Sequence, residues 1–335
     1  MKHRSQEGRC LEDRCRKPGA LLCALVLSLS LILAGCGQRT SSSLSEAKGP
    51  TLEQSELMVI VATERNRYEQ IYTDQIWNVA VDAAGTTFQD YLLEQIKLFV
   101  TDLQVIGAMA EEYGISLDSG EKEQLRRLSQ DYYSQLSEGD KAYMGAAQGD
   151  VLELYEKYHL ACKTVTELTK NADLEISDSE AKVIEIQKIV LEDAQTAQSV
   201  WEQAAAEGAD FAAIAESAST EEEIQEKLGR GEDGTAVEEA AFSLEKDAVS
   251  PVIESDGKYY ILKCINDYDQ DATLQRKEEL SLLRKDKAFR SVYDSFLAEH
   301  SITVPEEIWK NISCETEADT STTNFFELYK EYFPE

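Results

Sequence analysis

Apolar residues recur at the spacing of an α-helix from residue 51 to about residue 174. One of these faces is especially regular and consists of Val151, Leu154, Tyr158, Ala161, Val165 and Leu168. Steps of three and four residues place such side chains on one side of a helix. The same spacing predicts further helices at 51–80, 87–113 and 119–135. Few β-branched alternations interrupt the pattern, so the sequence predicts an all-helical domain over residues 51–175.

A different pattern occupies residues 176–270. The segment IEIQKIVL at 184–191 is short and rich in β-branched residues, which is typical of a strand. Two helical segments and a glycine-rich loop follow it, and a short helix comes next. Strand-like segments then lie at 250–253 and 258–265. This order predicts a small, separate α/β domain.

The chain becomes helical again over residues 271–335. Apolar side chains share one face of a helix predicted at 272–299, and an aromatic helix is predicted at 325–333. A chain of 335 residues is long for a single hydrophobic core. We expect these last helices to pack back on the first helical domain, so that the smaller domain is an insertion. The predicted fold class is α+β.

The amino-terminal residues 1–35 have the composition of a signal peptide. A basic segment precedes an apolar run at 20–34, which is too short to span a membrane comfortably. The end of this segment, LAGC, resembles the bacterial lipobox, and the resemblance implies cleavage before Cys36 and lipidation of its thiol and new amino group. Residues 36–50 would then form a flexible, serine-rich tether. The alternative is an uncleaved anchor; either way the bulk of the chain lies outside the cytoplasmic membrane and is anchored to it.

Charge and cysteine content exclude several classes of function. Acidic residues outnumber basic residues 64 to 33, and a net charge of −31 repels the phosphates of nucleic acids. The cysteines beyond residue 36 are Cys162, Cys264 and Cys314, which are too few and scattered for a disulfide framework, although a single bridge is left open. His159 and Cys162 have a metal-ligand spacing but no second pair accompanies them. No metal and no cofactor are therefore predicted.

Three segments of the α/β region resemble the parvulin family. GADFAAIAESAS at 208–219 resembles the parvulin pattern G-x-D-F-x-x-(L/I)-A-x-x-x-S. GRGEDGTAVEEAAFSL at 229–244 resembles the run G-R-G-x-M-V-x-x-F-E-x-A-A-F-x-L, and SPVIESDGKYYILK at 250–263 is similar to the closing strands of the family. Their order and spacing agree with the family, so the resemblance implies a parvulin fold over 176–270.

The lipobox and the flanking helices extend this resemblance to exported foldases of the PrsA and SurA type. AEEYGISL at 110–117 also resembles the end of the long helix in their amino-terminal chaperone domains. The resemblance implies a chaperone-like helical domain with an inserted parvulin-like domain, and unfolded or partly folded exported polypeptides as partners. It also implies the activity of parvulins, which accelerate rotation about peptide bonds that precede proline.

The residues expected at a parvulin catalytic centre differ in this chain. The first of the two family histidines falls on Lys188, and the second falls on Tyr260, or on Tyr259 if the alignment runs through Gly257. Lys188 either pairs with an acid, binds a substrate carbonyl or points to solvent as an ordinary strand residue. Because neither family histidine is present, we expect little or no isomerase activity.

The expected proline pocket also differs. The family methionine falls on Asp233 and the pocket phenylalanine falls on Val237, while Phe242 is a further candidate. A carboxylate is costly to bury without a partner, so Asp233 opposes an apolar pocket. Val237 and Phe242 fit a hydrophobic core as well as a pocket. The nearby acidic residues Glu221, Glu222 and Glu226 are expected to form a solvated face.

Aromatic residues of the helical domain are candidates for binding unfolded chains. They are Tyr68, Tyr72, Trp77, Tyr132, Tyr133, Tyr143, Tyr155 and Tyr158, and the competing interpretation is packing between helices. The predicted function is a membrane-anchored, extracytoplasmic foldase or holdase. The alternative is a non-catalytic binding or scaffolding lipoprotein that uses the parvulin fold as an interaction module. A solute-binding lipoprotein fits less well, because the chain lacks the repeated βα units of two α/β lobes.

Overall fold

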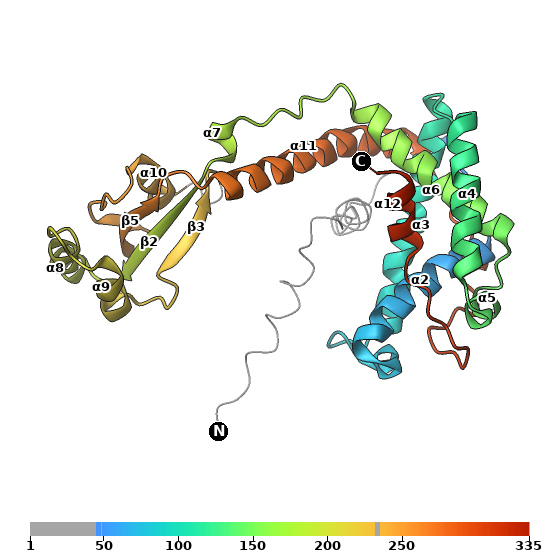
Figure 1. Ribbon diagram of the computed structural model, residues 1–335, viewed down its shortest axis with the longest axis horizontal. Helices are drawn as coiled ribbons and strands as arrows, with labels where there is room; N and C mark the ends of the chain where they lie inside the picture. The colour runs from blue at the N-terminus through green and yellow to red at the C-terminus, as the bar shows by residue number, and fades with distance from the viewer. Residues whose placement is uncertain (1–44, 48, 232–234, 335) are drawn as a thin grey trace. The chain divides into compact units, whose positions relative to one another are not determined.

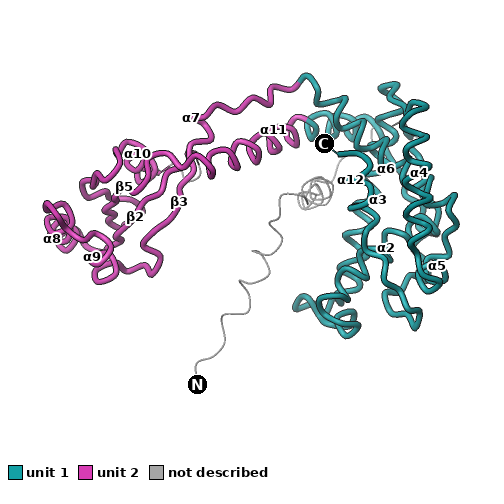
Figure 2. Tube along the Cα trace, in the orientation of Figure 1, with its two compact units in different colours: residues 1–171, 289–335 teal, residues 172–288 magenta. Residues whose placement is uncertain are grey.

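The structure is a computed structural model that describes residues 45–47, 49–231 and 235–334 (Figure 1). The chain divides into two compact units: residues 172–288 form one, and the residues before and after them form the other (Figure 2). We call them the sheet unit and the helical unit. The predicted signal peptide and Cys36 lie outside the described residues. Within the described ranges, no helix is long and apolar enough to cross a membrane.

The described part of the helical unit contains a series of five helices, three of which have a side-chain cap at the amino-terminal end. They are α2 (Gln54–Tyr72), α3 (Phe88–Glu112), α4 (Ser119–Gln135), α5 (Glu138–Met144) and α6 (Gln148–Thr169). Thr87 and Asp118 each accept a hydrogen bond from the third residue of the helix that they cap. The helix predicted at 51–80 ends at Tyr72, because Thr73 adopts a positive φ of 66° and a 3-10 helix, η2 (Asp74–Asn78), follows. The short helix α5 was not predicted.

The chain returns to the helical unit through α11 (Gln270–Glu299), whose residues from Phe289 onward belong to that unit. Two short strands, β1 (Ser45–Glu46) and β6 (His300–Ser301), pair in parallel. The 3-10 helix η3 (Glu306–Trp309) and the terminal helix α12 (Phe325–Tyr332) follow.

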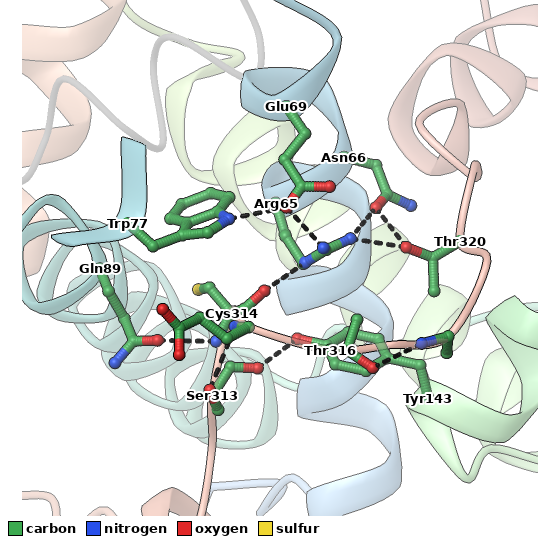
Figure 3. A network of polar contacts seen from close by, with 12 residues as sticks. Arg65, Asn66, Glu69, Trp77, Gln89, Tyr143, Ser313, Cys314, Thr316 and Thr320 are labelled. Atoms are coloured by element: carbon green, nitrogen blue, oxygen red, sulfur yellow. Dashed lines mark hydrogen bonds and ion pairs between the residues drawn. The ribbon is translucent and has the colours of Figure 1, made fainter. Parts of the chain in front are cut away.

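Buried polar contacts hold the segment before α12 against α2 (Figure 3). The guanidinium group of Arg65 donates to the carbonyl oxygen of Cys314 and to the hydroxyl of Thr320, the latter at 2.6 Å. Asn66 donates to the carbonyl oxygen of Thr322 at 2.9 Å. Arg65 and Asn66 are both buried, so these contacts tie residues at the two ends of the chain together inside the unit.

The sheet unit contains one four-stranded antiparallel sheet with the order β3-β2-β5-β4. The strands are β2 (Val183–Leu191), β3 (Gln225–Gly229), β4 (Ile253–Ser255) and β5 (Lys258–Asn266). The helix α7 (Asp178–Ala181) precedes the sheet. Strand β3 was not predicted, and β4 begins at Ile253, where the predicted strand ended. The α+β fold class is confirmed.

Each face of this sheet has its own hydrophobic core. On one face, Ile189 and Ile261 pack against α8 (Ala194–Ala204) and α9 (Phe211–Ala218). On the other face, Ile186 and Leu262 pack against α10 (Ala236–Ser243). Because side chains alternate along a strand, neighbouring residues of β2 and β5 serve different cores. A residue's face can thus be read from the register.

Cys162, Cys264 and Cys314 are all free thiols, so the disulfide that the sequence left open does not form in the structure. No group of histidine, cysteine and carboxylate side chains suited to a metal ion occurs among the described residues.

Candidate binding site on the sheet

The strand register places Lys188 and Tyr260 on the same face of the sheet. Lys188 lies opposite Leu262, and Tyr260 lies opposite Val190, the next residue of β2 on the Lys188 side. Tyr259 lies opposite Leu191 and packs against the core on the other face. Of the two tyrosines that the sequence offered as equivalents of the second histidine, the geometry therefore brings Tyr260 to the Lys188 face and takes Tyr259 away from it.

Lys188 is held in two ion pairs. Its Nζ atom lies 2.9 Å from Oε2 of Glu226 and 3.3 Å from Oε2 of Glu221, and its side chain is 15% exposed. Glu226 reaches the lysine because β3 pairs with β2 and places Glu226 opposite Ile186. Lys188 is therefore not a solvent-pointing strand residue. Pairing with an acid, one of the alternatives that the sequence left open, is present in the structure.

A second lysine completes the cluster. The Nζ atom of Lys258 lies 3.1 Å from Oε1 of Glu221, so Glu221 bridges two cations. We refer to Lys188, Glu221, Glu226 and Lys258 as the charged cluster. The sequence predicts Glu221 and Glu226 as part of a solvated face, and their ion pairs with the two lysines were not predicted. Lys188 and Glu226 are 38 residues apart in the sequence. The pairing of β3 with β2 brings these two residues together.

The electrostatics of the charged cluster keep all of its lysines protonated at neutral pH. Burial alone would lower the pKa of Lys188, but hydrogen bonds and charge interactions with Glu226 and Glu221 outweigh it, and the pKa is raised. The pKa of Glu221 is lowered, first by its hydrogen bond with Lys258 and despite a smaller opposing effect of burial. The cluster is thus a set of paired charges.

Two of the candidate pocket residues lie on α10, which packs against the same face of the sheet. Val237 and Phe242 are partly buried and pack against the core formed with Leu262 on this face. The guanidinium carbon of Arg230 lies 4.5 Å from the centre of the Phe242 ring, so a cation covers one side of that ring. Asp233 lies outside the described residues.

No imidazole is present anywhere in the sheet unit, because the sequence of residues 172–288 contains no histidine. His159 and His300 both belong to the helical unit. Nδ1 of His159 is 2.7 Å from the hydroxyl of Tyr329, and Nδ1 of His300 is 3.1 Å from the carbonyl oxygen of Phe296. The Tyr260 hydroxyl and the paired charges of the cluster are among the polar groups on this face of the sheet.

Most of the candidate aromatic residues are packed inside the helical unit. Trp77, Tyr132, Tyr155 and Tyr158 are buried, and three of these contact the chain's own terminal helix. The ring of Tyr155 stacks on that of Phe325 with a centroid separation of 4.1 Å, while Tyr158 contacts Tyr329 at 4.7 Å. Tyr72 alone among the eight is exposed. The packing interpretation accounts for the buried rings.

Comparison with known protein families agrees with the fold of the sheet unit. Residues 169–276 match the family model described as PPIC-type PPIASE domain. The foldase protein PrsA of Streptococcus pneumoniae (strain CGSP14) is 30% identical over 253 residues, which cover 65% of this chain and 80% of the relative. A solved PrsA structure from Bacillus cereus gives a TM-score of 0.37 at 18% identity and covers 75% of this chain and 98% of its own. Because a relative of this identity is matched over most of its length, the chain belongs to the PrsA foldase family and carries a PPIC-type parvulin domain.

Proposed function

We propose that the chain is an extracytoplasmic foldase that binds unfolded or partly folded exported polypeptides, and that its parvulin domain has little or no prolyl isomerase activity. Membership of the PrsA family supports the first part, since the matched relatives are named foldases. The charged cluster supports the second part. We further propose that the chain is anchored to the bacterial membrane through a lipid on Cys36, on the basis of the LAGC sequence after a basic and apolar leader.

The observation that carries the catalytic part of the proposal is the pairing of Lys188 with Glu226 and Glu221. Rotation about a prolyl bond has a barrier of about 18–20 kcal/mol. A catalyst lowers this barrier only through contacts that are stronger to the twisted amide than to the planar one. A lysine that is already neutralised by two carboxylates has to break an ion pair before it can make such a contact. The site therefore favours binding over catalysis.

A prolyl-peptide isomerisation assay tests this part. The material is the chain from residue 37 to 335, which keeps every residue that the structure describes. We expect the wild-type rate to equal that of buffer, and we expect Lys188→His with Tyr260→His to raise it. The matched control is Lys188→His with Tyr259→His, because Tyr259 lies on the opposite face of the sheet and its replacement should leave the rate unchanged. Efficient isomerisation by the wild-type chain would overturn this part of the proposal.

The foldase part is tested by aggregation of a denatured client protein during dilution from denaturant. We expect the same chain to suppress light scattering at a stoichiometric ratio. A scaffolding lipoprotein, the second candidate, would leave the scattering unchanged. The observation in its favour is that four of the eight candidate aromatic residues are buried, and three of these contact α12. Lipid attachment is tested by metabolic labelling with an alkyne-bearing fatty acid. Cys36→Ser should abolish the label and release the protein from the membrane fraction.

A further inference from the structure

Exposed apolar side chains gather at one end of the helical unit. Five of the nine large apolar side chains that are exposed in the described part of the chain fall within residues 71–91, so their distribution is strongly uneven. We call this group the apolar tip, and it consists of Ile71, Tyr72, Val79, Val81 and Tyr91. Ile71 and Tyr72 end α2, the two valines lie in the loop that joins α2 to α3, and Tyr91 lies in the first turn of α3 (Figure 1).

The loop that carries the valines is a small, fixed hairpin. The amide of Val81 donates to the carbonyl oxygen of Thr86 at 2.9 Å, and the amide of Phe88 donates to that of Val79 at 2.8 Å. Gly85 has a φ of +86°, which suits the turn. The carboxylate of Asp82 accepts three hydrogen bonds from within the turn, including one from the Thr86 hydroxyl at 2.7 Å. The hairpin is thus held in one conformation by its own contacts.

Packed aromatic side chains, including Trp77, support the apolar tip. Trp77 is 1% exposed and donates from Nε1 to the carboxylate of Glu69 at 2.7 Å. The ring of Phe88 lies 5.8 Å from that of Trp77 and 6.1 Å from that of Tyr91. Val79 and Val81 flank Ala80, which forms an isolated antiparallel bridge with Thr87, so the two valines project from the same side of the hairpin. The hairpin contacts and the packed aromatic rings therefore fix the positions of these apolar side chains. Nothing in the described structure covers them, so they stay exposed to solvent.

The charge around the apolar tip is mostly negative, although Arg65 pairs with Glu69 and Arg67, four residues before Ile71 on α2, is 46% exposed. Residues 68–96 contain no lysine and no arginine, and they contain the acidic residues Glu69, Asp74, Asp82, Asp90 and Glu94. The carboxylate of Glu315, which lies 2.5 Å from the side-chain nitrogen of Asn78, adds a further negative charge. Contiguous exposed apolar surface marks an interaction site, and charge complementarity selects which partner can use it. An acidic rim repels acidic segments and attracts basic ones.

We propose that the apolar tip docks unfolded polypeptide segments in which bulky apolar residues alternate with lysine or arginine. This inference rests on the proposed foldase function and names the class of client segment and the place where it binds. The apolar side chains of the client cover the valines and the aromatic rings, and its basic side chains face Asp74 and Glu94. Binding of this kind weakens as salt screens the rim charges.

The test uses the chain from residue 37 to 335 and two short fluorescent peptides with the same leucine and phenylalanine residues. Lysine separates the apolar residues in one peptide, and glutamate separates them in the other. We expect the lysine peptide to bind at least about tenfold more tightly, which corresponds to about 1.4 kcal/mol. We expect Ile71→Ser with Val79→Ser to weaken this binding by a similar factor, since the two side chains are 71% and 53% exposed and their loss should leave the fold intact.

Matched controls come from exposed residues of the sheet unit. Leu274→Ser with Leu283→Ser removes two side chains that are 52% and 63% exposed, and it should leave binding unchanged. Glu94→Lys should weaken binding of the lysine peptide and strengthen that of the glutamate peptide, whereas Glu278→Lys on α11 should do neither. Circular dichroism and melting temperature confirm that each variant is folded.

The outcomes separate this inference from the proposed function. If the wild-type chain suppresses client aggregation but the tip variant binds the lysine peptide as well as the wild type does, the docking surface is elsewhere and the foldase function stands. Equal affinity for the lysine and glutamate peptides would likewise overturn the inference about the client. If the wild-type chain binds neither peptide and does not suppress aggregation, both proposals fail.

Discussion

The Nζ atom of Lys188 lies 2.9 Å from Oε2 of Glu226, on the face of the sheet to which Tyr260 also belongs. The lysine comes from β2 and the glutamate from the edge strand β3, so the ion pair connects two strands as well as neutralising a charge. In this position the resemblance to parvulins places a histidine. The ion pair with Glu226 therefore explains how the sheet accommodates the charged Lys188 in place of a histidine.

The first prediction concerns the strength of this pair. Lys188→Met and Glu226→Gln should each destabilise the sheet unit by about 1–2 kcal/mol, because each leaves a partly buried charge without one of its partners. The double variant should lose less than the sum, with a coupling of about 1 kcal/mol. Hydrogen exchange of the β2 and β5 amides measures these free energies. Lys246→Met, which removes an exposed lysine outside the charged cluster, serves as the control. Strict additivity of the two variants would show that the pair contributes nothing.

Sequence periodicity was sufficient for the elements whose signal is local. The spacing of apolar residues predicted α3, α4 and α6, and β-branched content predicted β2. It failed for β3, because Gln225–Gly229 is polar and becomes a strand through its pairing with β2. The end of α2 was placed too late because the apolar pattern continues beyond Thr73, where the backbone turns.

The candidate site was also predictable only in part, because some of its contacts depend on pairing between strands that are distant in the sequence. The resemblance to parvulins led to Lys188 and Tyr260 by position, and the structure brings both to one face. Neither Glu221 nor Glu226 could be identified, since nothing in an acidic sequence distinguishes a carboxylate that faces a lysine from one that faces water. Such a contact depends on register between strands that are far apart in sequence.

A second prediction concerns a buried carboxyl group in the helical unit. Asp102 on α3 is 3% exposed and accepts a hydrogen bond from the Tyr293 hydroxyl at 2.6 Å. Burial raises the pKa of Asp102 to about 6, while the hydrogen bond and the charge of Arg290 oppose this. In the unfolded chain the pKa is near 3.8. Between these values the folded state binds more protons, so the contribution of Asp102 to stability falls as pH rises from about 4 to about 6.

Asp102→Asn should lack this pH dependence. Relative to the wild type, the variant should gain about 2–3 kcal/mol of unfolding free energy between pH 4 and pH 7, because it never has to bury a charge. Urea unfolding at several pH values measures the difference. Asp294→Asn, an exposed change on α11, is the control and should show the wild-type profile. Parallel profiles for Asp102→Asn and the wild type would contradict the prediction.

A third prediction uses the thiol of Cys314 as a probe of the segment that Arg65 holds. Cys314 is 0% exposed, and chiefly burial raises the pKa of its thiol to about 12, so it should react slowly with a maleimide. Arg65→Lys keeps the charge but removes the planar group that donates to Cys314 and Thr320 together. The loss of about 1.5–3 kcal/mol should raise the labelling rate of Cys314 roughly tenfold to a hundredfold.

Mass spectrometry of the labelled peptides measures this rate, with Cys162 in the same sample as an internal reference. Arg67→Lys is the matched control. Arg67 lies on the same helix, is 46% exposed and forms a salt bridge with Glu64, three residues before it. Equal labelling of Cys314 in the wild type and in Arg65→Lys would mean that the guanidinium group does not hold the segment in place.

The last prediction compares two glycines that occupy equivalent positions, the second residue of α5 and the second residue of α6. A Cβ atom on Gly139 would lie 2.0 Å from the carbonyl oxygen of Asp319, whereas one on Gly149 would have no neighbour within 4 Å. Gly139→Ala should therefore push the 313–324 segment away and destabilise the helical unit by about 1–3 kcal/mol. Gly149→Ala should stabilise it by up to about 1 kcal/mol, because alanine restricts the unfolded chain and favours helix. Thermal unfolding of the two variants should give shifts of opposite sign, and shifts of the same sign would show that the close approach of Asp319 does not constrain position 139.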